Sequence, residues 1–154
     1  MPKVSAIPKG LHTVTPALTV KGCAEALAFY AKAFGAVEMS RAPDASGKKI
    51  MHAAFMIGES AFYINDELPE MGAFARPANF WIYGEDVDRR HARAVAAGAR
   101  ATMPPTDAFW GDRFSKVLDP WGNDWTLAQR IKDLTPAEMK AAGEAFFAEM
   151  STAH

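Results

Sequence analysis

The sequence predicts an α+β fold made of two β-α-β-β-β modules and a C-terminal helix. Strand-like and helix-like hydrophobic patterns follow one another in the same order twice along the 154 residues. Alternating runs at 113–118 and 124–128 flank Asp119-Pro120-Trp121-Gly122, whose composition is typical of a tight turn and predicts a β-hairpin. Such a repeat implies two modules that bury a common core within a single domain, residues 1–154.

The composition is that of an ordinary globular protein. About half of the residues are apolar and the formal net charge is −1, so nothing favours a nucleic-acid partner. Cys23 is the only cysteine, which excludes an intrachain disulfide and favours a reducing compartment. The N-terminus lacks the apolar region of a signal peptide, and no run approaches the length of a membrane span. We expect a cytoplasmic protein without membrane contacts.

The first module spans about 12–66. Residues 12–20 alternate and predict a strand, in which Pro16 favours an edge position or an irregularity. Residues 24–34 have apolar side chains at helical spacing, with Gly35 as the expected C-cap. A short strand at 36–41 follows, and 50–57 with 60–65 predicts a hairpin across Gly58-Glu59.

The second module spans about 78–130 and follows a linker at about 67–77. Residues 79–83 predict a strand, 87–97 a helix ended by Gly98, and 100–103 a short strand before two prolines. The hairpin around 119–122 completes the module. Thr135-Pro136-Ala137-Glu138 is a capping box that begins a helix of about 135–150. Its apolar stripe must dock on its own sheet or on a partner subunit.

Several motifs resemble the vicinal oxygen chelate superfamily, which includes glyoxalase I, bleomycin-resistance proteins and extradiol dioxygenases. They are Phe29-Tyr30, Phe34-Gly35 and Asp119-Pro120-Trp121-Gly122. The stretches 103–114, 125–127 and 134–139 resemble its PhnB-like branch, and the resemblance covers Thr13 to Met139. It implies that each module curls into a half-barrel around a cleft, and it favours a homodimer.

The resemblance also implies where the superfamily's metal ligands fall. In its metal-using enzymes, one side chain from the first and last strand of each module holds a divalent ion. Those positions correspond to Thr15, Tyr63, Asn79 and Thr126, none of which is His, Asp or Glu. Neutral oxygens give a divalent cation no charge compensation, so we expect no metal cofactor.

A ligand cavity is predicted from the strand phases. In the last strand Trp125 and Leu127 take one face, and Asp124, Thr126 and Ala128 take the other. The predicted cavity residues are Thr13, Thr15, Tyr63, Asn65, Asn79, Trp81, Tyr83 and Thr126, with Asp124 on the same side. Either the aromatic rings line a pocket for a flat small molecule, or they fill the interior.

The titratable residues each have a functional and a structural interpretation. His12, His52, His91 and His154 are the only histidines; His52 is either a base or a hydrogen-bonded residue of a half-buried strand. Asp124 acts as an acid or base only if burial raises its pKa. Asp112-Arg113 forms either a salt-bridged rim or an anion site, with the structural interpretation favoured. Cys23 is expected to be inert.

Two functions follow from these observations. The first is metal-independent binding of a small molecule in an aromatic-lined cavity. The alternative is a superfamily enzyme (a lyase, isomerase or dioxygenase) that uses a displaced metal or a His52 and Asp124 acid–base pair.

Overall fold

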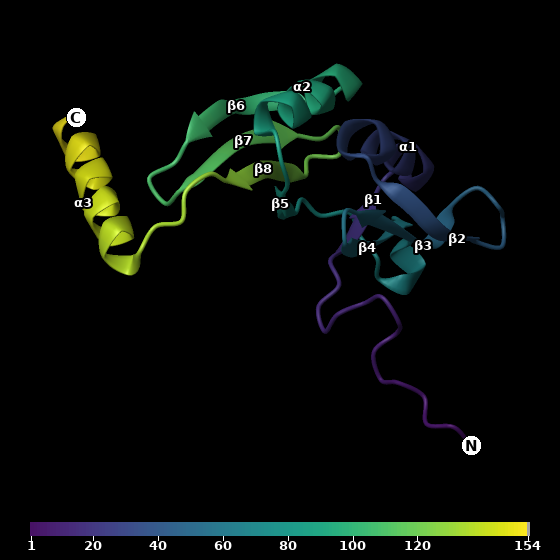
Figure 1. The fold of residues 1–154 in the computed structure, drawn as a ribbon. Coiled ribbons are helices and arrows are strands. Elements are labelled where there is room, and N and C mark those ends of the chain that lie inside the picture. Colours follow the sequence, from purple (N-terminus) through teal and green to yellow (C-terminus); the bar gives the residue numbers. More distant parts are fainter. Residues whose placement is uncertain (154) are drawn as a thin grey trace. The chain divides into compact units, whose positions relative to one another are not determined.

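The computed structural model describes residues 1–153, so His154 lies outside the described residues. The chain forms two compact units, one ending at Ala78 and the other beginning at Asn79 (Figure 1). Among the described residues, no helix is long and apolar enough to cross a membrane.

The first unit is a four-stranded mixed sheet with one crossover helix. Its strand order is β1-β4-β3-β2, with β1 parallel to β4 and the other pairs antiparallel. The elements are β1 (Ala17–Val20), α1 (Cys23–Phe34), β2 (Val37–Pro43), β3 (Ile50–Ile57), β4 (Ser60–Asp66) and the 3-10 turn η1 (Pro69–Met71).

The N-terminus of helix α1 is fixed to this sheet. Buried Asp66, at the end of β4, accepts hydrogen bonds from the backbone N–H groups of Gly22 and Cys23, which are otherwise unpaired at a helix N-terminus. Its other oxygen accepts from the N–H of Ile50. Gly35 ends the helix with a left-handed φ of 70°, as the sequence predicts.

The second unit repeats this topology, with strand order β5-β8-β7-β6 and β5 parallel to β8. Its elements are β5 (Asn79–Tyr83), α2 (Val87–Ala97), β6 (Arg100–Asp107), β7 (Asp112–Leu118), β8 (Asp124–Arg130) and α3 (Pro136–Thr152). The predicted α+β class, the β-α-β-β-β order of both modules and the C-terminal helix are therefore confirmed. Each sheet is open, with edge strands at both sides.

Three elements differ from the prediction in extent. The first strand begins at Ala17 rather than at residue 12, and its pairing with β4 starts where Tyr63 N–H donates to the Pro16 carbonyl. Strand β6 continues through Pro104-Pro105 to Asp107, which an edge strand tolerates because its outer N–H groups need no ladder partner. The predicted linker contains η1, closed by a bridge between Leu68 and Ala73.

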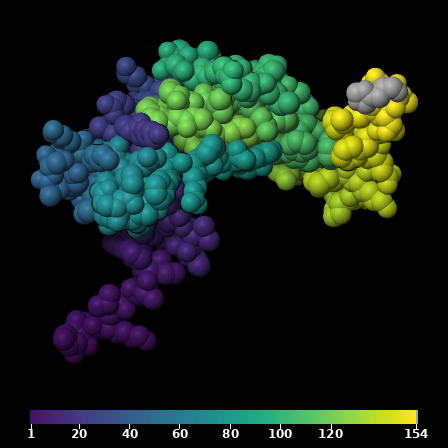
Figure 2. All heavy atoms as spheres, turned by 180° about the vertical axis from the view of Figure 1, so that it is seen from behind, coloured from purple at the N-terminus to yellow at the C-terminus, as the bar shows by residue number. Residues whose placement is uncertain are grey.

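Helix α3 begins as the capping box predicts, because Thr135 Oγ1 accepts a hydrogen bond from Glu138 N–H at 3.2 Å. The helix packs on Phe109, whose ring would lie 3.3 Å from a Cβ placed on buried Gly143. Phe146 and Phe147 also contact Phe109. Most of the helix surface remains open, as Figure 2 shows in yellow, and Phe147 and Met150 are exposed.

Candidate functional site

One face of the second sheet carries a group of aromatic side chains. Strand β8 lies between β5 and β7. On β5, Trp81 pairs with Thr126 of β8 and Tyr83 pairs with Ala128, and Ala128 pairs in turn with Phe114 of β7. The opposite face packs against α2, where His91 Nδ1 and Ser115 Oγ are 2.9 Å apart. Trp125 and Leu127 are fully buried on that side, so the predicted alternation of β8 is confirmed.

We call Trp81, Tyr83, Trp110 and Phe114 the aromatic platform. The ring of Trp81 stacks on Phe114, with centroids 6.0 Å apart and planes 17° apart, and lies 6.3 Å from the rings of Tyr83 and Trp110. Trp110 and Phe114 are 5.3 Å apart. The stacked rings come from the strands on either side of β8, whose Thr126 and Ala128 are buried. The platform itself is accessible, with Trp81 48% and Tyr83 61% exposed.

A buried carboxylate joins two of these rings. Asp112 is 2% exposed, and its Oδ2 accepts a hydrogen bond from Tyr83 Oη at 2.8 Å and from Trp110 Nε1 at 2.9 Å. Its Oδ1 is buried without a hydrogen-bond partner. The hydrogen bond to Asp112, together with burial and the carboxylate charge, raises the pKa of Tyr83. Tyr83 is therefore held as a protonated donor.

Arg90 of α2 fixes the strand ends beneath Tyr83. Its guanidinium donates to the carbonyl of Ile82 at 2.9 Å and to that of Ala128 at 3.2 Å, which ties β5 to β8. A Cβ on Gly84 would lie 3.0 Å from the guanidinium carbon, so the small residue makes room for this contact. Burial lowers the pKa of Arg90.

The predicted cavity residues fall into two groups, one in each unit. Asn79, Trp81, Tyr83 and Thr126 share the platform face of the second sheet, with half-buried Asp124 opposite Asn79. Asp124 Oδ1 is also buried without a partner. In the first unit the group comprises Tyr63 and Asn65, which share one face of β4, while Thr13 and Thr15 precede β1.

His52 lies in the first unit beside Tyr63. It is exposed on β3, and its ring meets the Tyr63 ring edge-on with centroids 4.6 Å apart. Asn65 is hydrogen-bonded nearby, to Thr19 Oγ1 at 3.4 Å and to the Asp66 carbonyl at 2.8 Å. Asp124, the other residue of the predicted acid–base pair, belongs to the second unit.

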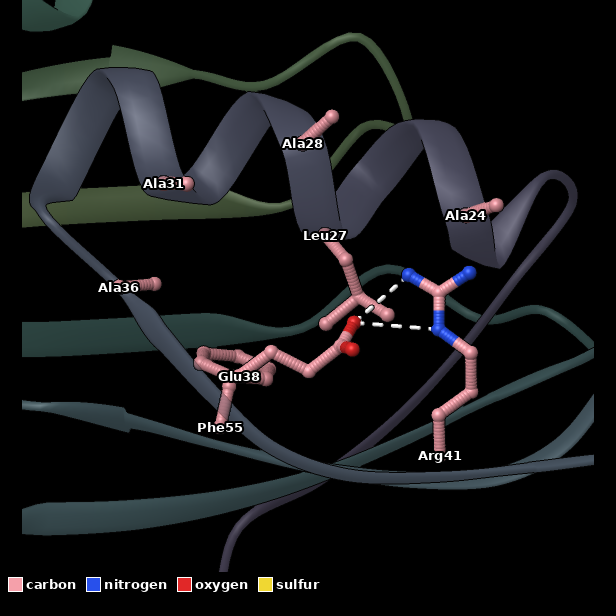
Figure 3. Close-up of a pocket in the computed structure, with 8 residues that line it drawn as sticks. All are labelled: Ala24, Leu27, Ala28, Ala31, Ala36, Glu38, Arg41 and Phe55. Carbon is pink, nitrogen blue, oxygen red and sulfur yellow. Dashed lines mark hydrogen bonds and ion pairs between the residues drawn. The ribbon is translucent and has the colours of Figure 1, made fainter.

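Two small pockets lie within the first unit. One, of about 260 Å³, separates α1 from β2 and β3 (Figure 3). It is lined mostly by alanines with Leu27 and Phe55, and Glu38 and Arg41 form an ion pair at 2.6 Å on its β2 side. The other, of about 320 Å³, lies between β1 and residues 72–78 and includes Thr19. Apart from the Glu38–Arg41 pair, the first pocket presents only apolar side chains.

Other predicted residues have structural roles. Arg113 donates two hydrogen bonds to Asp88 of α2, at 2.8 and 2.9 Å, and one to Asp107 at 2.8 Å, so its ion pairs are with these two residues and not with Asp112. Those bonds hold the pKa of Asp88 below its usual range. Cys23 is fully buried, and burial raises the pKa of its thiol to about 12. A thiol of this kind is not an activated nucleophile.

Trp110, Asp112 and Phe114 were not among the predicted cavity residues. The place of Phe114 follows in principle from the sequence, because an antiparallel hairpin that turns at 119–122 pairs residue 114 with residue 128. Trp110 precedes β7, so no strand phase assigns it to a face. Asp112 was predicted only as a neighbour of Arg113, whose side chain bonds to Asp88 of α2 on the opposite face of the sheet.

The chain belongs to the Glyoxalase/Bleomycin resistance protein/Dioxygenase superfamily, whose family model matches residues 10–127. It is 36% identical over 138 residues to an uncharacterized protein of Mycobacterium bovis, covering 84% of this chain and 90% of that protein. Its fold is similar to that of TioX from Micromonospora sp. ML1, with a TM-score of 0.63 and 22% identity over 80% of this chain and all of that one.

The fold is also similar to the PhnB protein of Bacillus cereus, which the predicted PhnB-like branch led us to expect. The TM-score is 0.57, at 19% identity over 77% of this chain and 99% of that one. Identity at this level shows a shared fold, and function in such folds is decided by the site.

Proposed function

We propose that this chain binds a small organic molecule on the aromatic platform of its second sheet, without a divalent metal. The observation that carries the proposal is the exposure of Trp81 and Tyr83 on a sheet face that also holds Trp110 and Phe114. Large rings normally bury most of their surface, and a group of exposed rings beside a few fixed polar atoms is typical of ligand sites.

The positions that correspond to the superfamily's metal ligands do not fit a divalent cation. They supply only hydroxyl and amide oxygens, from Thr15, Tyr63, Asn79 and Thr126. Thr126 is also 3% exposed. Among residues 1–153, no group of three or more His, Cys, Asp or Glu side chains lies close enough together to hold a metal ion. We place the proposed binding on the ring faces of the platform.

The enzymatic alternative with His52 and Asp124 stays a prediction. A general base needs a partner that orients it, and the contact that His52 makes is with the edge of the Tyr63 ring. The environment of His52 therefore favours the binding function.

A pair of matched variants tests the proposal. Trp81 and Phe74 are each 48% exposed, but Phe74 lies in the first unit. Saturation-transfer NMR on a set of flat aromatic compounds should give contacts that weaken at least fivefold in Trp81→Ala and stay unchanged in Phe74→Ala. Equal weakening in both variants would contradict a platform site.

Metal dependence is tested on the same protein. A ligand present at a hundred times its Kd stabilises the native state by about 2.7 kcal/mol, a Tm increase of several degrees. We expect no saturable increase when Zn²⁺, Ni²⁺, Mn²⁺ or Fe²⁺ is added to metal-stripped protein. A clear increase with one ion would contradict metal-free binding and would direct attention to lyase and dioxygenase assays.

We also propose a homodimer, supported by the exposed apolar residues of α3. Phe146 is 42%, Met150 47% and Phe147 58% exposed, although a surface helix normally buries its apolar residues. Light scattering should give twice the chain mass for the native protein and a lower mass for Phe147→Asp. A monomeric native protein would contradict this proposal without affecting the platform.

A further inference from the structure

We infer that the aromatic platform recognises an organic cation, namely a flat apolar group that carries a quaternary ammonium or a protonated amine, with Asp112 as its counter-charge. The inference rests on the proposed function and names the class of ligand for the same site. Its basis is the combination of exposed ring faces with a buried carboxylate that lacks a cationic partner and whose Oδ1 accepts no hydrogen bond.

The orientation of two rings favours a cation. Trp110 Nε1–H and Tyr83 O–H both point at Asp112 Oδ2, at 2.9 and 2.8 Å. Their polar hydrogens are therefore not available to hold an anionic ligand. The ring faces carry the negative part of the quadrupole, and indole is the best such face for a cation. Trp81 adds a second, half-exposed indole beside them.

The charge of Asp112 has no partner within residues 1–153. No Lys, Arg or His nitrogen of the described residues forms an ion pair with it, and its Oδ1 accepts no hydrogen bond. Arg130 is opposite Asp112 across the ladder, but its guanidinium lies 3.3 Å from the Lys132 carbonyl and 4.0 Å from Asp133. A buried carboxylate in this state is costly unless it is paired, so a bound cation would offset part of that cost.

The other charged residues on this face raise the competing possibility of an anionic ligand. Lys116 pairs with Thr126 on β8, and Asp124 lies at the far end of the same strand. If Lys116 and Arg130 dominated the field, the platform would prefer anionic ligands. The buried position of Asp112 favours the cation, because a charge shielded from water by rings is screened less than the exposed Arg130.

Three probes of one shape separate these possibilities. Benzyltrimethylammonium carries the cation, neopentylbenzene is its neutral carbon isostere, and phenylmethanesulfonate is an anion of similar size. Binding is followed by the tryptophan fluorescence of the full chain, to which Trp81 and Trp110 contribute, and by ligand NMR. We expect the native protein to bind the cation at least fivefold more tightly than the neutral isostere, and the anion most weakly.

Variants then assign the preference to its residues. Asp112→Asn keeps the shape and removes the charge, so the ratio of cation to isostere affinity should fall to near one. Trp81→Leu should weaken the cation by more than the isostere, because it removes an indole face. Phe74→Ala serves as the control that changes neither. Near-ultraviolet circular dichroism verifies that each variant is folded. If Asp112→Asn does not fold, the probe ratios of the native protein and of Trp81→Leu decide the result.

The outcomes distinguish this inference from the proposed function. Equal affinity for cation and isostere, both lost in Trp81→Leu, would overturn the cation preference and leave a neutral-ligand site. Tighter binding of the anion would also overturn it, in favour of Lys116 and Arg130. Binding of all three probes that is insensitive to Trp81→Leu would overturn the platform as a site, and with it both proposals.

Discussion

Replacing Asp119 by Asn is a conservative substitution, but it should strongly destabilise the β7–β8 hairpin. Asp119 Oδ1 accepts from the backbone N–H of Trp121 and Asn123, both at 2.9 Å. Oδ2 accepts from Trp125 Nε1 at 2.9 Å and Asn123 Nδ2 at 3.1 Å. Asp119, Asn123 and Trp125 are each at most 3% exposed. One carboxylate thus satisfies four donors in the turn.

The magnitude follows from the donors that Asn leaves unpaired. An Asn side chain has one acceptor oxygen, so its NH₂ group must face two of the four donors. Each buried donor without a partner costs about 1–3 kcal/mol, which gives a total of about 4 kcal/mol. For a chain of this length that corresponds to a Tm decrease of about 8–16 °C.

The assay is urea unfolding followed by tryptophan fluorescence. Asp133→Asn is the control, since Asp133 is 98% exposed and its pairing with Arg130 at 4.0 Å should contribute less than about 1 kcal/mol. Trp125→Phe removes one of the donors, so the double variant should lose less stability than the sum of the two single variants. If Asp119→Asn and Asp133→Asn unfold within 1 kcal/mol of each other (about the contribution of one hydrogen bond), the hydrogen bonds of Asp119 do not hold the turn.

Three further predictions follow. The Cys23 thiol ionises near 9.0 when unfolded and near 12 in the native state, so stability should fall above pH 9. Between pH 8 and 10 the free energy of unfolding should fall by about 1.4 kcal/mol more in the native sequence than in Cys23→Ala. Urea midpoints that change with pH in parallel in the two proteins would contradict this. Gly143→Leu should undock α3, because even a Cβ there lies 3.3 Å from the Phe109 ring; unchanged amide-exchange protection at 139–147 would show that the contact is not needed. Asp112→Asn should lower the pKa of Tyr83 by weakening the hydrogen bond that raises it. Ultraviolet titration at 295 nm measures this, with Tyr63→Phe identifying the signal of the half-buried Tyr63.

Much of the fold is determined locally, and the sequence therefore predicted it. Gly35 permits the left-handed φ that ends α1, and Thr135 caps α3 through a bond between residues three positions apart. Period-two alternation assigned Trp125 and Leu127 to the core side of β8. The start of β1 was predicted too early because alternation at 12–16 does not reveal that pairing with β4 begins only where Tyr63 N–H donates to the Pro16 carbonyl.

The site depended on contacts that only the tertiary structure decides. The sequence placed Trp81, Tyr83 and Thr126 on one face. It did not show that Trp81 and Phe114 stack from strands on either side of β8, whose Thr126 is buried. Nor did it show that Trp110 and Tyr83 share the Asp112 carboxylate. The physical reason is separation along the sequence. Caps and alternation arise between residues a few positions apart. The platform instead joins residues 81 to 114, which are brought together by strand register and by the burial of a charge.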